Sequence, residues 1–306
     1  MLKKESVSDL TLTEIRAFNA TIQQGNFTRA ADLLGVSQPA VTAQIRKIEG
    51  RFDVPLLERT SKGVRATDLG QRLYKITRQY VDLDASVQSL INPAGDERSL
   101  EIHIATASPL VFMPLLAAFR QQYPEATLKI TSGTTDECRE HVLAREVDIG
   151  LFPLPKPGAG LSHLTFHAHQ LVAILHPEHP LAADESVSVH DLIDESLIFS
   201  RRESFTQQMV DAAFAGEGLA PSSNILMNVR SDICEAVAQG LGVGFALSHD
   251  IRPDPSYSAV PIKEASQEVQ EHLVWLKSRT HLPEIQLFVS MALEMRSRQF
   301  GQASGI

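Results

Sequence analysis

The segment from residue 26 to residue 67 constrains the fold of this chain more than any other. Small and apolar side chains over residues 28–34 predict a short helix, and Gly35 predicts the tight turn that ends it. The Ser-Gln-Pro sequence at residues 37–39 then predicts the start of a second helix, because a serine hydroxyl caps free backbone N–H groups and proline suits the first helical turn. The spacing therefore predicts two short helices that cross at a tight turn.

The second of these helices has an apolar face and a polar face. Val41, Ile45 and Ile48 recur at helical spacing and predict the buried face. On the other face, Gln38 and Thr42 can form hydrogen bonds with base edges in the major groove of DNA, whereas guanidinium groups are better suited to phosphate. A small helical core with a charged loop would show the same pattern, so that interpretation stays open at this point.

A basic stretch follows the second helix and predicts a hairpin. Arg59, Lys62 and Arg65 flank Gly63, an arrangement suited to a wing that lies along the DNA backbone. The predicted DNA contacts lie on the two helices and on this hairpin. They are Thr28, Arg29, Ser37, Gln38, Pro39, Thr42, Arg46, Arg59, Lys62 and Arg65.

The same segment resembles the LysR-type transcriptional regulators. The matching motifs are a small-residue pair at 30–31, Ser-Gln-Pro-Ala at 37–40, Ile-x-x-Ile-Glu at 45–49, Leu-Leu-x-Arg at 56–59 and Thr-x-x-Gly at 67–70. The resemblance implies an N-terminal winged helix-turn-helix that binds double-stranded DNA, followed by an α/β effector domain with two lobes, similar to periplasmic binding proteins. It also implies a homodimer through the linker helix and, because tetramers are usual in the family, favours a homotetramer; the sequence does not decide between dimer and tetramer.

The net charge of −9 is unevenly distributed along the chain. Residues 1–70 hold ten lysines and arginines against eight acidic residues, a balance of +2, so the remaining residues carry −11. Phosphate contacts require a local basic patch rather than a basic chain, and dimerisation would double that patch. The length of 306 residues predicts one or two further domains behind the helix-turn-helix.

Residues 67–91 predict a long helix that begins at Thr67. Its apolar positions alternate in steps of four and three, the heptad pattern of two helices packed together. They are Leu69, Leu73, Ile76, Tyr80, Leu83, Val87 and Leu90. We expect this helix to join two copies of the chain, although packing against its own domain is the alternative. The Asn-Pro-Ala-Gly-Asp sequence at residues 92–96 then predicts a hinge.

Strand and helix patterns alternate beyond the hinge, which predicts an α/β fold with mainly parallel sheet pairing. The proline-rich residues 153–158 predict a crossover into a second lobe, and residues 271–276 predict a returning strand. The predicted domains are the winged helix-turn-helix at 1–66, the linker helix and hinge at 67–98, and the effector domain at 99–306. Within the effector domain, lobe 1 takes about 99–165 and 271–306, and lobe 2 takes about 166–270.

Three predicted strand-to-helix turns carry hydroxyl groups, at residues 106–108, 132–135 and 200–206. Ligands of open α/β sheets lie at such turns, where the free N–H groups of helix starts favour anions. Serine and threonine are also ordinary helix caps, so each turn alone could be structural. In the resembled family the matching turns face the cleft between the lobes. The predicted effector contacts are Thr106, Ala107, Ser108, Gly133, Thr134, Thr135, Arg201, Arg202, Ser204 and Thr206.

Arg201 and Arg202 could hold carboxylate or phosphonate oxygens, or could form an ordinary solvated pair. Residues 202–206, with residues 252–255 later in the chain, resemble a subgroup of the family linked to 2-aminoethylphosphonate catabolism. That resemblance implies a small anionic or zwitterionic effector, such as a phosphonate or a carboxylate. The operator and the direction of regulation are not predicted.

The remaining signals predict no catalytic chemistry. The histidines at 163, 167, 169, 176 and 179 lack the accompanying cysteine or carboxylate spacing of a metal site, so neither a metal nor a cofactor is predicted. No nucleophile motif is present, so we do not expect an enzyme, although a small-molecule-binding protein or an enzyme is the alternative to a regulator. A polar N-terminus and the absence of an apolar run of about 18 residues predict a cytoplasmic protein without membrane partners.

Overall fold

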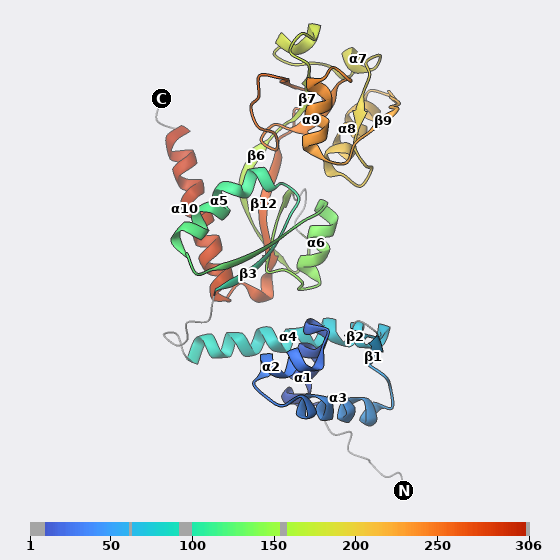
Figure 1. Ribbon diagram of the computed structural model, residues 1–306. Helices are drawn as coiled ribbons and strands as arrows, with labels where there is room; N and C mark the ends of the chain where they lie inside the picture. The colour runs from blue at the N-terminus through green and yellow to red at the C-terminus, as the bar shows by residue number, and fades with distance from the viewer. Residues whose placement is uncertain (1–9, 61–62, 92–99, 154–157, 304–306) are drawn as a thin grey trace. The chain divides into compact units, whose positions relative to one another are not determined.

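The structure, a computed structural model, describes residues 10–60, 63–91, 100–153 and 158–303 (Figure 1). Lys62, the side chain of Leu90, the predicted hinge at 92–96 and residues 154–157 of the predicted crossover lie outside the described part. The chain divides into two compact units, residues 1–95 and 96–306, and each unit is described by itself.

The first unit is a helix-turn-helix domain with a wing and a long following helix. Its elements are α1 (Leu12–Gln24), α2 (Phe27–Leu34), α3 (Gln38–Phe52), β1 (Leu57–Thr60), β2 (Gly63–Ala66) and α4 (Asp68–Ile91). Asn26 caps α2, so this helix begins one residue earlier than the sequence predicts. Gly35, at φ 64°, ends α2 in the left-handed conformation that favours glycine, which confirms the predicted turn. Ser37 caps α3, as predicted.

The core of this unit forms where α1, α2 and α3 cross. Val41, Ile45 and Ile48 are between 1% and 3% exposed, which confirms the predicted buried face of α3. These side chains pack with Phe18 of α1 and Leu56, which precedes the wing. The apolar face of α3 is therefore buried inside the domain, and its polar face is exposed to solvent.

A buried carboxylate ties α3 to α1. Glu14 of α1 is fully buried and lies 3.0 Å from the Lys47 amine and 2.8 Å from the Arg51 guanidinium. Burial acts to raise the pKa of Glu14, but hydrogen bonds from Arg51, the N–H of Thr11 and Lys47 outweigh it and lower the pKa to about 2. Glu14 also completes a capping box with Thr11, so the same residue fixes the start of α1.

The long helix α4 packs one face against its own unit and leaves another face open. Thr67 accepts a hydrogen bond from the N–H of Gly70 at 3.0 Å, which confirms the predicted helix start. On the inner face, Thr77 donates to Asn19 of α1 at 2.6 Å. Leu73 was predicted for the seam between copies, but it packs against the core of its own unit because it faces inward. The open face carries an apolar stripe, the α4 stripe, made of Leu69, Ile76, Tyr80, Leu83 and Val87.

The second unit has two lobes, and the first is built on a five-stranded sheet of order β4-β3-β5-β12-β6. The strands are β3 (Glu101–Thr106), β4 (Thr127–Ser132), β5 (Ile149–Pro153), β6 (Leu161–His169) and β12 (Val269–Leu276). The helices of this lobe are α5 (Pro109–Gln122), α6 (Thr135–Leu143) and α10 (Pro283–Ala303). β3 pairs in parallel with β4 and β5, whereas β12 is antiparallel to both of its neighbours.

The sheet of the second lobe is antiparallel. β7 (Leu171–Leu175) pairs with β10 (Gly244–Leu247) and with β11 (Ser258–Pro261), both in the antiparallel sense. The other elements are the parallel pair β8 (Ile198–Phe199) and β9 (Ile225–Leu226), and the helices α7 (Val189–Leu192), α8 (Phe205–Gly216) and α9 (Arg230–Ala238). The prediction of mainly parallel pairing came from the three strand patterns up to residue 152; it is confirmed for β3, β4 and β5 and does not extend to this lobe. Alternation of strands and helices does not fix strand direction when a long segment, here residues 176–243, separates two neighbours.

The chain crosses between the lobes later than the sequence predicts. After the proline-rich segment it forms β6, which pairs with β12 over residues 161–169 and so stays in the first lobe. The crossing follows His169, where β6 ends and β7 soon begins, and β12 makes the return (Figure 1). Short 3₁₀ segments lie at Pro180–Ala183, Lys263–Ala265 and Lys277–Arg279. The sequence prediction ended the first lobe too early, because β6 carries polar side chains on its partly exposed face and gives a weak strand signal.

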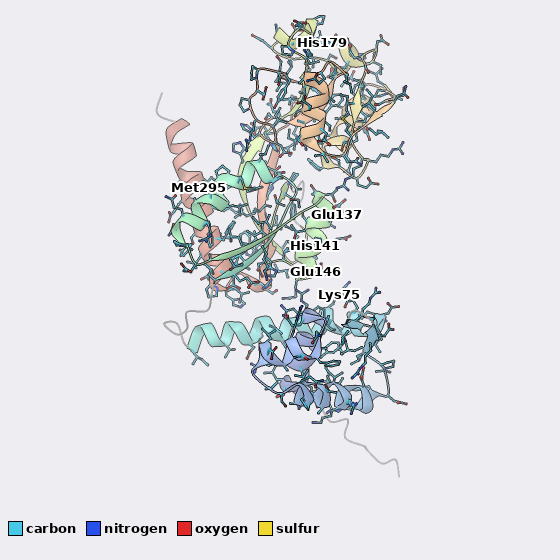
Figure 2. The ribbon with its side chains drawn as sticks, in the orientation of Figure 1. Lys75, Glu137, His141, Glu146, His179 and Met295 are labelled. Carbon is cyan, nitrogen blue, oxygen red and sulfur yellow. The ribbon has the colours of Figure 1, made fainter. Side chains whose placement is uncertain are left out.

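Side chains at both ends hold helix α6 in place. At its start, Thr134 and Glu137 form a capping box. At its other end, His141 Nδ1 lies 2.6 Å from Glu146 Oε2. Figure 2 shows Glu137, His141 and Glu146 following one another along this edge of the lobe. These contacts fix the first turn of α6 just beyond the end of β4, at one of the predicted ligand turns.

Candidate functional site

The polar face of α3 and the wing form the first candidate site. Gln38, Thr42 and Arg46 of α3 line a shallow depression of about 670 Å³ together with Arg59 of β1. Gln38 Nε2 donates to Thr42 Oγ1 at 3.0 Å, so the two side chains predicted to contact bases are held as a pair. Arg46 is exposed, as a phosphate contact requires.

The other predicted DNA contacts differ in their surroundings. Pro39 lines the same depression, whereas Ser37 uses its hydroxyl to cap α3. Thr28 and Arg29 belong to the first turn of α2 and are exposed, and Arg65 is exposed on β2. The structure therefore gathers only part of the predicted set at one depression.

A cation–π contact positions the wing side of this surface. The Arg59 guanidinium lies over the ring of Phe27, 5.7 Å from its centroid, and this cation–π contact holds β1 against α2. Lys47, which sequence analysis did not select, also lines the depression. Lys47 is exposed on α3, and its amine pairs with Glu14. Sequence analysis selected residues four apart on one helix face, Gln38, Thr42 and Arg46, and Lys47 falls outside that spacing.

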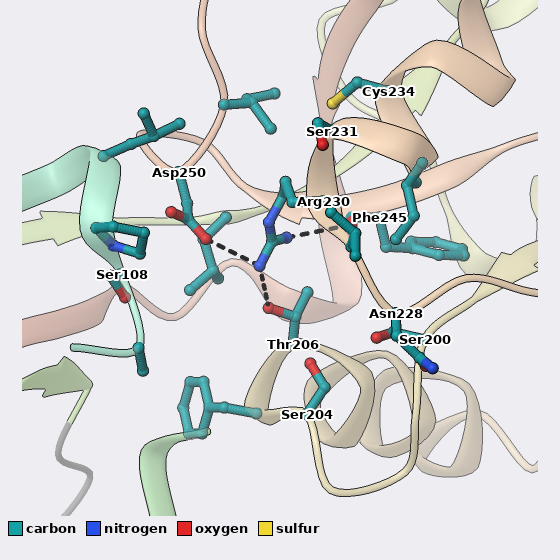
Figure 3. A pocket seen from close by; sticks show the side chains of 18 of the residues that line it. Ser108, Ser200, Ser204, Thr206, Asn228, Arg230, Ser231, Cys234, Phe245 and Asp250 are labelled. Atoms are coloured by element: carbon teal, nitrogen blue, oxygen red, sulfur yellow. Dashed lines mark hydrogen bonds and ion pairs between the residues drawn. The ribbon is translucent and has the colours of Figure 1, made fainter. Parts of the chain in front are cut away.

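The second candidate site is a cavity of about 780 Å³, lined by both lobes of the second unit and called here the interlobe cavity (Figure 3). The three hydroxyl-bearing turns predicted from the sequence meet there. Their residues in its lining are Thr106, Ala107, Ser108, Gly133, Thr134, Thr135, Arg201, Ser204 and Thr206.

Four helices begin at the interlobe cavity. α5, α6, α8 and α9 each contribute residues of their first turn to its lining. Ser108 and Ser204 stand at the N-cap positions of α5 and α8, and neither uses its side chain to cap the helix. Backbone N–H groups at helix starts carry partial positive charge and attract anions. The cavity therefore suits a negatively charged ligand.

A cation that sequence analysis missed, Arg230, reaches the cavity from the start of α9. Its guanidinium lies 2.8 Å from Asp250 Oδ2, and it donates to Thr206 Oγ1 at 3.4 Å and to the carbonyl oxygen of Phe245 at 3.5 Å (Figure 3). A guanidinium has five N–H donors, so these contacts leave some for a ligand. Residues 228–231 form a strand-to-helix turn like the three selected from the sequence, and the same rule applied there would have found Arg230.

Asp250 is the acidic group of the cavity and follows β10. Its side chain is 7% exposed. Burial raises the pKa of Asp250 to about 6, against the opposing effect of Arg230, with smaller contributions from Glu271 and His169. Above that pH the Arg230–Asp250 pair has no net charge, so the helix starts and hydroxyl groups carry most of the attraction for an anion.

The two predicted effector arginines lie in different places. Arg201 lines the cavity, and its guanidinium is 3.8 Å from Glu137 of α6, so this contact joins the second lobe to the first. Arg202 is exposed and is not part of the lining. The prediction of Arg202 as an effector contact is therefore corrected.

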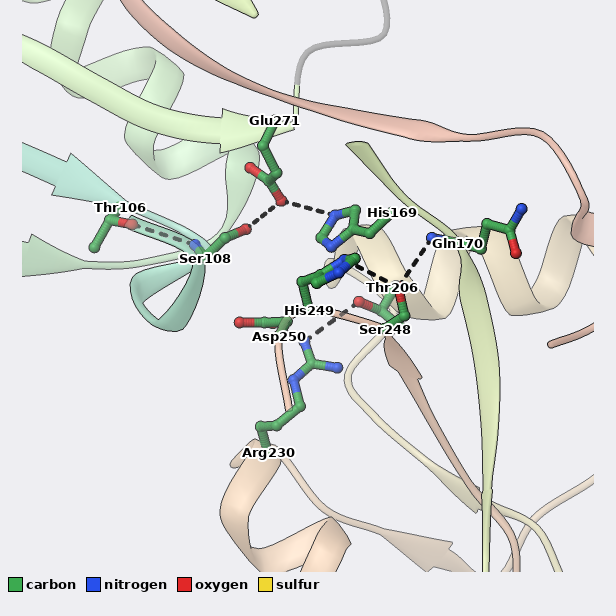
Figure 4. A network of polar contacts seen from close by, with 10 residues as sticks. All are labelled: Thr106, Ser108, His169, Gln170, Thr206, Arg230, Ser248, His249, Asp250 and Glu271. Carbon is green, nitrogen blue, oxygen red and sulfur yellow. Dashed lines mark hydrogen bonds and ion pairs between the residues drawn. The ribbon is translucent and has the colours of Figure 1, made fainter. Parts of the chain in front are cut away.

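A buried polar network lies beside the cavity where the lobes are joined (Figure 4). Ser108 donates to Glu271 Oε1 at 2.6 Å, and His169 Nε2 lies 3.1 Å from the same oxygen without hydrogen-bond geometry. His167 and His249 pack edge to face, with ring centroids 4.3 Å apart. Burial and neighbouring histidines lower the pKa of both rings. The network links α5 of the first lobe to both crossover strands, β6 and β12.

The described residues contain no cluster of three or more His, Cys, Asp or Glu side chains that could hold a metal ion. Cys138 is buried, and burial raises the pKa of its thiol to about 12, which makes it a poor nucleophile. Over the same part of the chain, no helix combines the length and the apolar composition needed to cross a membrane.

The chain matches two family models, one in each unit. The model of the bacterial regulatory helix-turn-helix proteins of the lysR family matches residues 12–71. The model of the LysR substrate binding domain matches residues 94–297, which is more than half of the chain.

Curated relatives and solved structures agree with these matches. The HTH-type transcriptional regulator CysL of Bacillus subtilis (strain 168) is 29% identical over 81% of this chain and 84% of its own length. The HTH-type transcriptional regulator CbbR of Xanthobacter flavus is 28% identical over 79% of this chain and 74% of its own. A full-length OxyR variant from Pseudomonas aeruginosa shares the fold with a TM-score of 0.78 over 93% of this chain and 95% of its own, at 20% identity.

The matched families and relatives are transcription regulators rather than enzymes. The first unit carries the helix-turn-helix and wing, and the second carries the two-lobed α/β domain with its interlobe cavity. With both units matched in this way, the chain belongs to the LysR family of DNA-binding transcriptional regulators.

Proposed function

We propose that this regulator responds to a small anion or zwitterion, such as a phosphonate or a carboxylate, bound in the interlobe cavity. The observation that supports the proposal is the convergence of four helix starts and Arg230 on one cavity. Helix-start N–H groups and a guanidinium both stabilise phosphonate and carboxylate oxygens. A cavity of about 780 Å³ holds a ligand of this size together with water.

In this proposal the polar face of α3 and the wing contact double-stranded DNA in the cytoplasm. Residues 1–66 are the DNA-binding domain, 67–98 the linker and hinge, and 99–306 the effector domain. Gln38 and Thr42 meet base edges, and Arg46 meets phosphate. All three line the same depression on one face of α3, where Gln38 and Arg46 are exposed and Thr42 is partly buried, which supports these roles.

Two copies of the chain pair through the α4 stripe, and dimers associate into tetramers. The five side chains of the stripe are between 42% and 61% exposed, and a second copy would remove this apolar surface from water. Effector binding then favours one arrangement of the subunits and so changes the spacing of the two α3 helices on DNA.

Calorimetric titration of the full-length chain with 2-aminoethylphosphonate tests the effector proposal. Binding heat is expected at millimolar ligand or below. Arg230→Gln should weaken binding ~10- to 100-fold, because a hydrogen bond to a charged group contributes about 1.5–3 kcal/mol. Ser204→Ala, which leaves the Arg230–Asp250 pair intact, should weaken it less.

Arg202→Gln is the matched control, because Arg202 is exposed and outside the cavity lining. This variant should bind like the wild type. The proposal fails if 2-aminoethylphosphonate gives no heat, or if Arg230→Gln and Arg202→Gln have equal effects.

A further inference from the structure

The residues just before α5 have their backbone donors engaged. The N–H of Ala107 donates to the carbonyl oxygen of Leu151 at 3.0 Å, and the N–H of Ser108 donates to Thr106 Oγ1 at 3.2 Å. The next residue, Pro109, has no N–H. The free N–H groups of this helix start therefore begin only at Leu110, beyond Ser108.

The Ser108 hydroxyl proton is also engaged, in a hydrogen bond to Glu271. The hydroxyl donates its proton to Glu271 Oε1 at 2.6 Å, and Glu271 is fully buried in β12, outside the cavity lining. Among the described residues this is the one hydrogen bond to the carboxylate, and Oε2 has no partner there. With its proton held by Glu271, Ser108 presents only oxygen lone pairs to a ligand.

Asp250 supplies a second acceptor. The residue is 5% exposed, and its Oδ2 pairs with Arg230 at 2.8 Å. The described residues provide no contact for Oδ1, and Figure 3 shows this oxygen turned away from Arg230. Ser108 and Asp250 both line the cavity, so they offer it a hydroxyl oxygen and a carboxylate oxygen as acceptors.

Donors are concentrated at the starts of α8 and α9. Their N-cap residues, Ser204 and Val229, provide no side-chain cap, so the first N–H groups of both helices have no side-chain partner at the cap. Arg230 adds the N–H groups that its three protein contacts do not use. The cavity thus offers donors from Arg230 and the starts of α8 and α9, and acceptors from Ser108 and Asp250.

We propose that the effector carries a protonated amine beside its anionic group, with the amine bound by Ser108 and Asp250 and the anion bound by Arg230 and the starts of α8 and α9. Glu271 is a positioning residue, which does not touch the ligand and keeps Ser108 as an acceptor. An anion without the amine would leave the Asp250 carboxylate facing it without a donor, which weakens binding. This inference rests on the proposed function and narrows it from small anions to those that bear an amine.

Matched pairs of ligands test this inference on the full-length protein. Calorimetric titrations compare 2-aminoethylphosphonate with ethylphosphonate, β-alanine with propionate, and taurine with ethanesulfonate, so that the members of each pair differ by the amine. In at least one pair the amine-bearing member should bind ~10-fold more tightly or better, the effect of one hydrogen bond to a charged group.

Variants then test whether Ser108 and Asp250 bind the amine and whether Glu271 positions the Ser108 hydroxyl. Ser108→Ala and Asp250→Asn, which each remove an acceptor, should reduce the amine preference to ~3-fold or less. Glu271→Met frees the Ser108 hydroxyl to donate and should have the same effect, whereas Glu271→Gln keeps an acceptor oxygen and should restore part of the preference. Ser222→Ala and Glu268→Met are matched controls, because both residues are exposed and outside the cavity lining, and they should leave the preference unchanged.

The outcomes separate this inference from the proposed function. Equal binding of both members of every pair overturns the inference and leaves the anion site standing. Absence of binding by every compound overturns both. An amine preference that survives in Ser108→Ala and Asp250→Asn overturns the assignment of the amine, and these two variants decide the matter even if Glu271→Met does not fold.

Discussion

Arg230 and Asp250 determine the charge of the interlobe cavity by pairing with each other. Burial opposes ionisation of Asp250, while the guanidinium 2.8 Å away favours it, and the resulting pKa of about 6 is above the ordinary value of an aspartate. The other groups that face Asp250 are Glu271 of β12 and His169 of β6. A fall in pH through about 6 therefore changes the charge that a ligand meets.

We expect the affinity for an amine-free anion to rise as the pH falls through about 6. Above that pH the Asp250 carboxylate repels the anion, and below it the carboxyl group is neutral while Arg230 keeps its charge. Ethanesulfonate, which stays ionised throughout, should bind several-fold more tightly at pH 5 than at pH 7.5. Asp250→Asn should remove most of this change. A pH profile that is flat, or that is the same in Asp250→Asn, would contradict the role given to this carboxylate.

Among the elements, α3 and β6 show which parts of the fold the sequence can predict. The cap, the proline and the apolar spacing of α3 all lie within the helix or next to it, and its predicted start at Gln38 is confirmed. β6 pairs with β12, about 100 residues further along the chain, so residues 161–169 contain little that indicates a strand. The antiparallel direction of β10 beside β7 depends on pairing of the same distant kind.

The residues of the interlobe cavity also divide into those that a local sequence signal predicts and those that only distant strand pairing positions. Hydroxyl groups at strand-to-helix turns are a local signal, and the sequence predicts three of these turns at the cavity. Arg230 lies at a fourth strand-to-helix turn, after β9, which the same local rule would have indicated. Asp250 and Glu271 come to the site through the antiparallel strands β10 and β12, whose positions only the folded sheets determine.

Substitutions on α3 should distinguish its base contacts from its phosphate contacts. Arg46→Ala removes a phosphate contact, so it should weaken binding to all DNA sequences alike and reduce the slope of log affinity against log salt by about 1. Gln38→Ala should instead relax base preference and leave that slope nearly unchanged. Fluorescence anisotropy with operator and scrambled DNA at several salt concentrations measures both effects.

Arg120→Ala is the charge-matched control for this experiment, because Arg120 is an exposed residue of α5 in the second unit with no predicted role in DNA binding. Its binding should match the wild type at every salt concentration. If Arg46→Ala and Gln38→Ala change affinity, slope and base preference in the same way, the roles assigned to the two side chains are wrong.

Over the whole molecule, charge and apolar surface are distributed between the two units. Residues 1–70 have a balance of only +2, while the remainder of the chain carries −11. One copy of the winged helix-turn-helix therefore brings few cations to DNA, and pairing of two copies is the simplest way to increase the number of phosphate contacts. The α4 stripe, with five exposed apolar side chains on one face of a 24-residue helix, is the surface available for that pairing.

The α4 stripe should therefore control both assembly and DNA affinity. Leu83 is 61% exposed, and Leu83→Glu places a charge in the middle of the stripe, where a second copy would have to bury it. Sedimentation velocity should show a shift from the wild-type assembly to a smaller species. Affinity for an operator with two half-sites should fall by ~10-fold or more, because the α3 helices of two copies are no longer linked and cannot bind both half-sites together. Gln79→Glu adds the same charge at an exposed position of α4 outside the stripe and should leave assembly and affinity unchanged. If Leu83→Glu keeps the wild-type sedimentation coefficient, the copies pair through another surface.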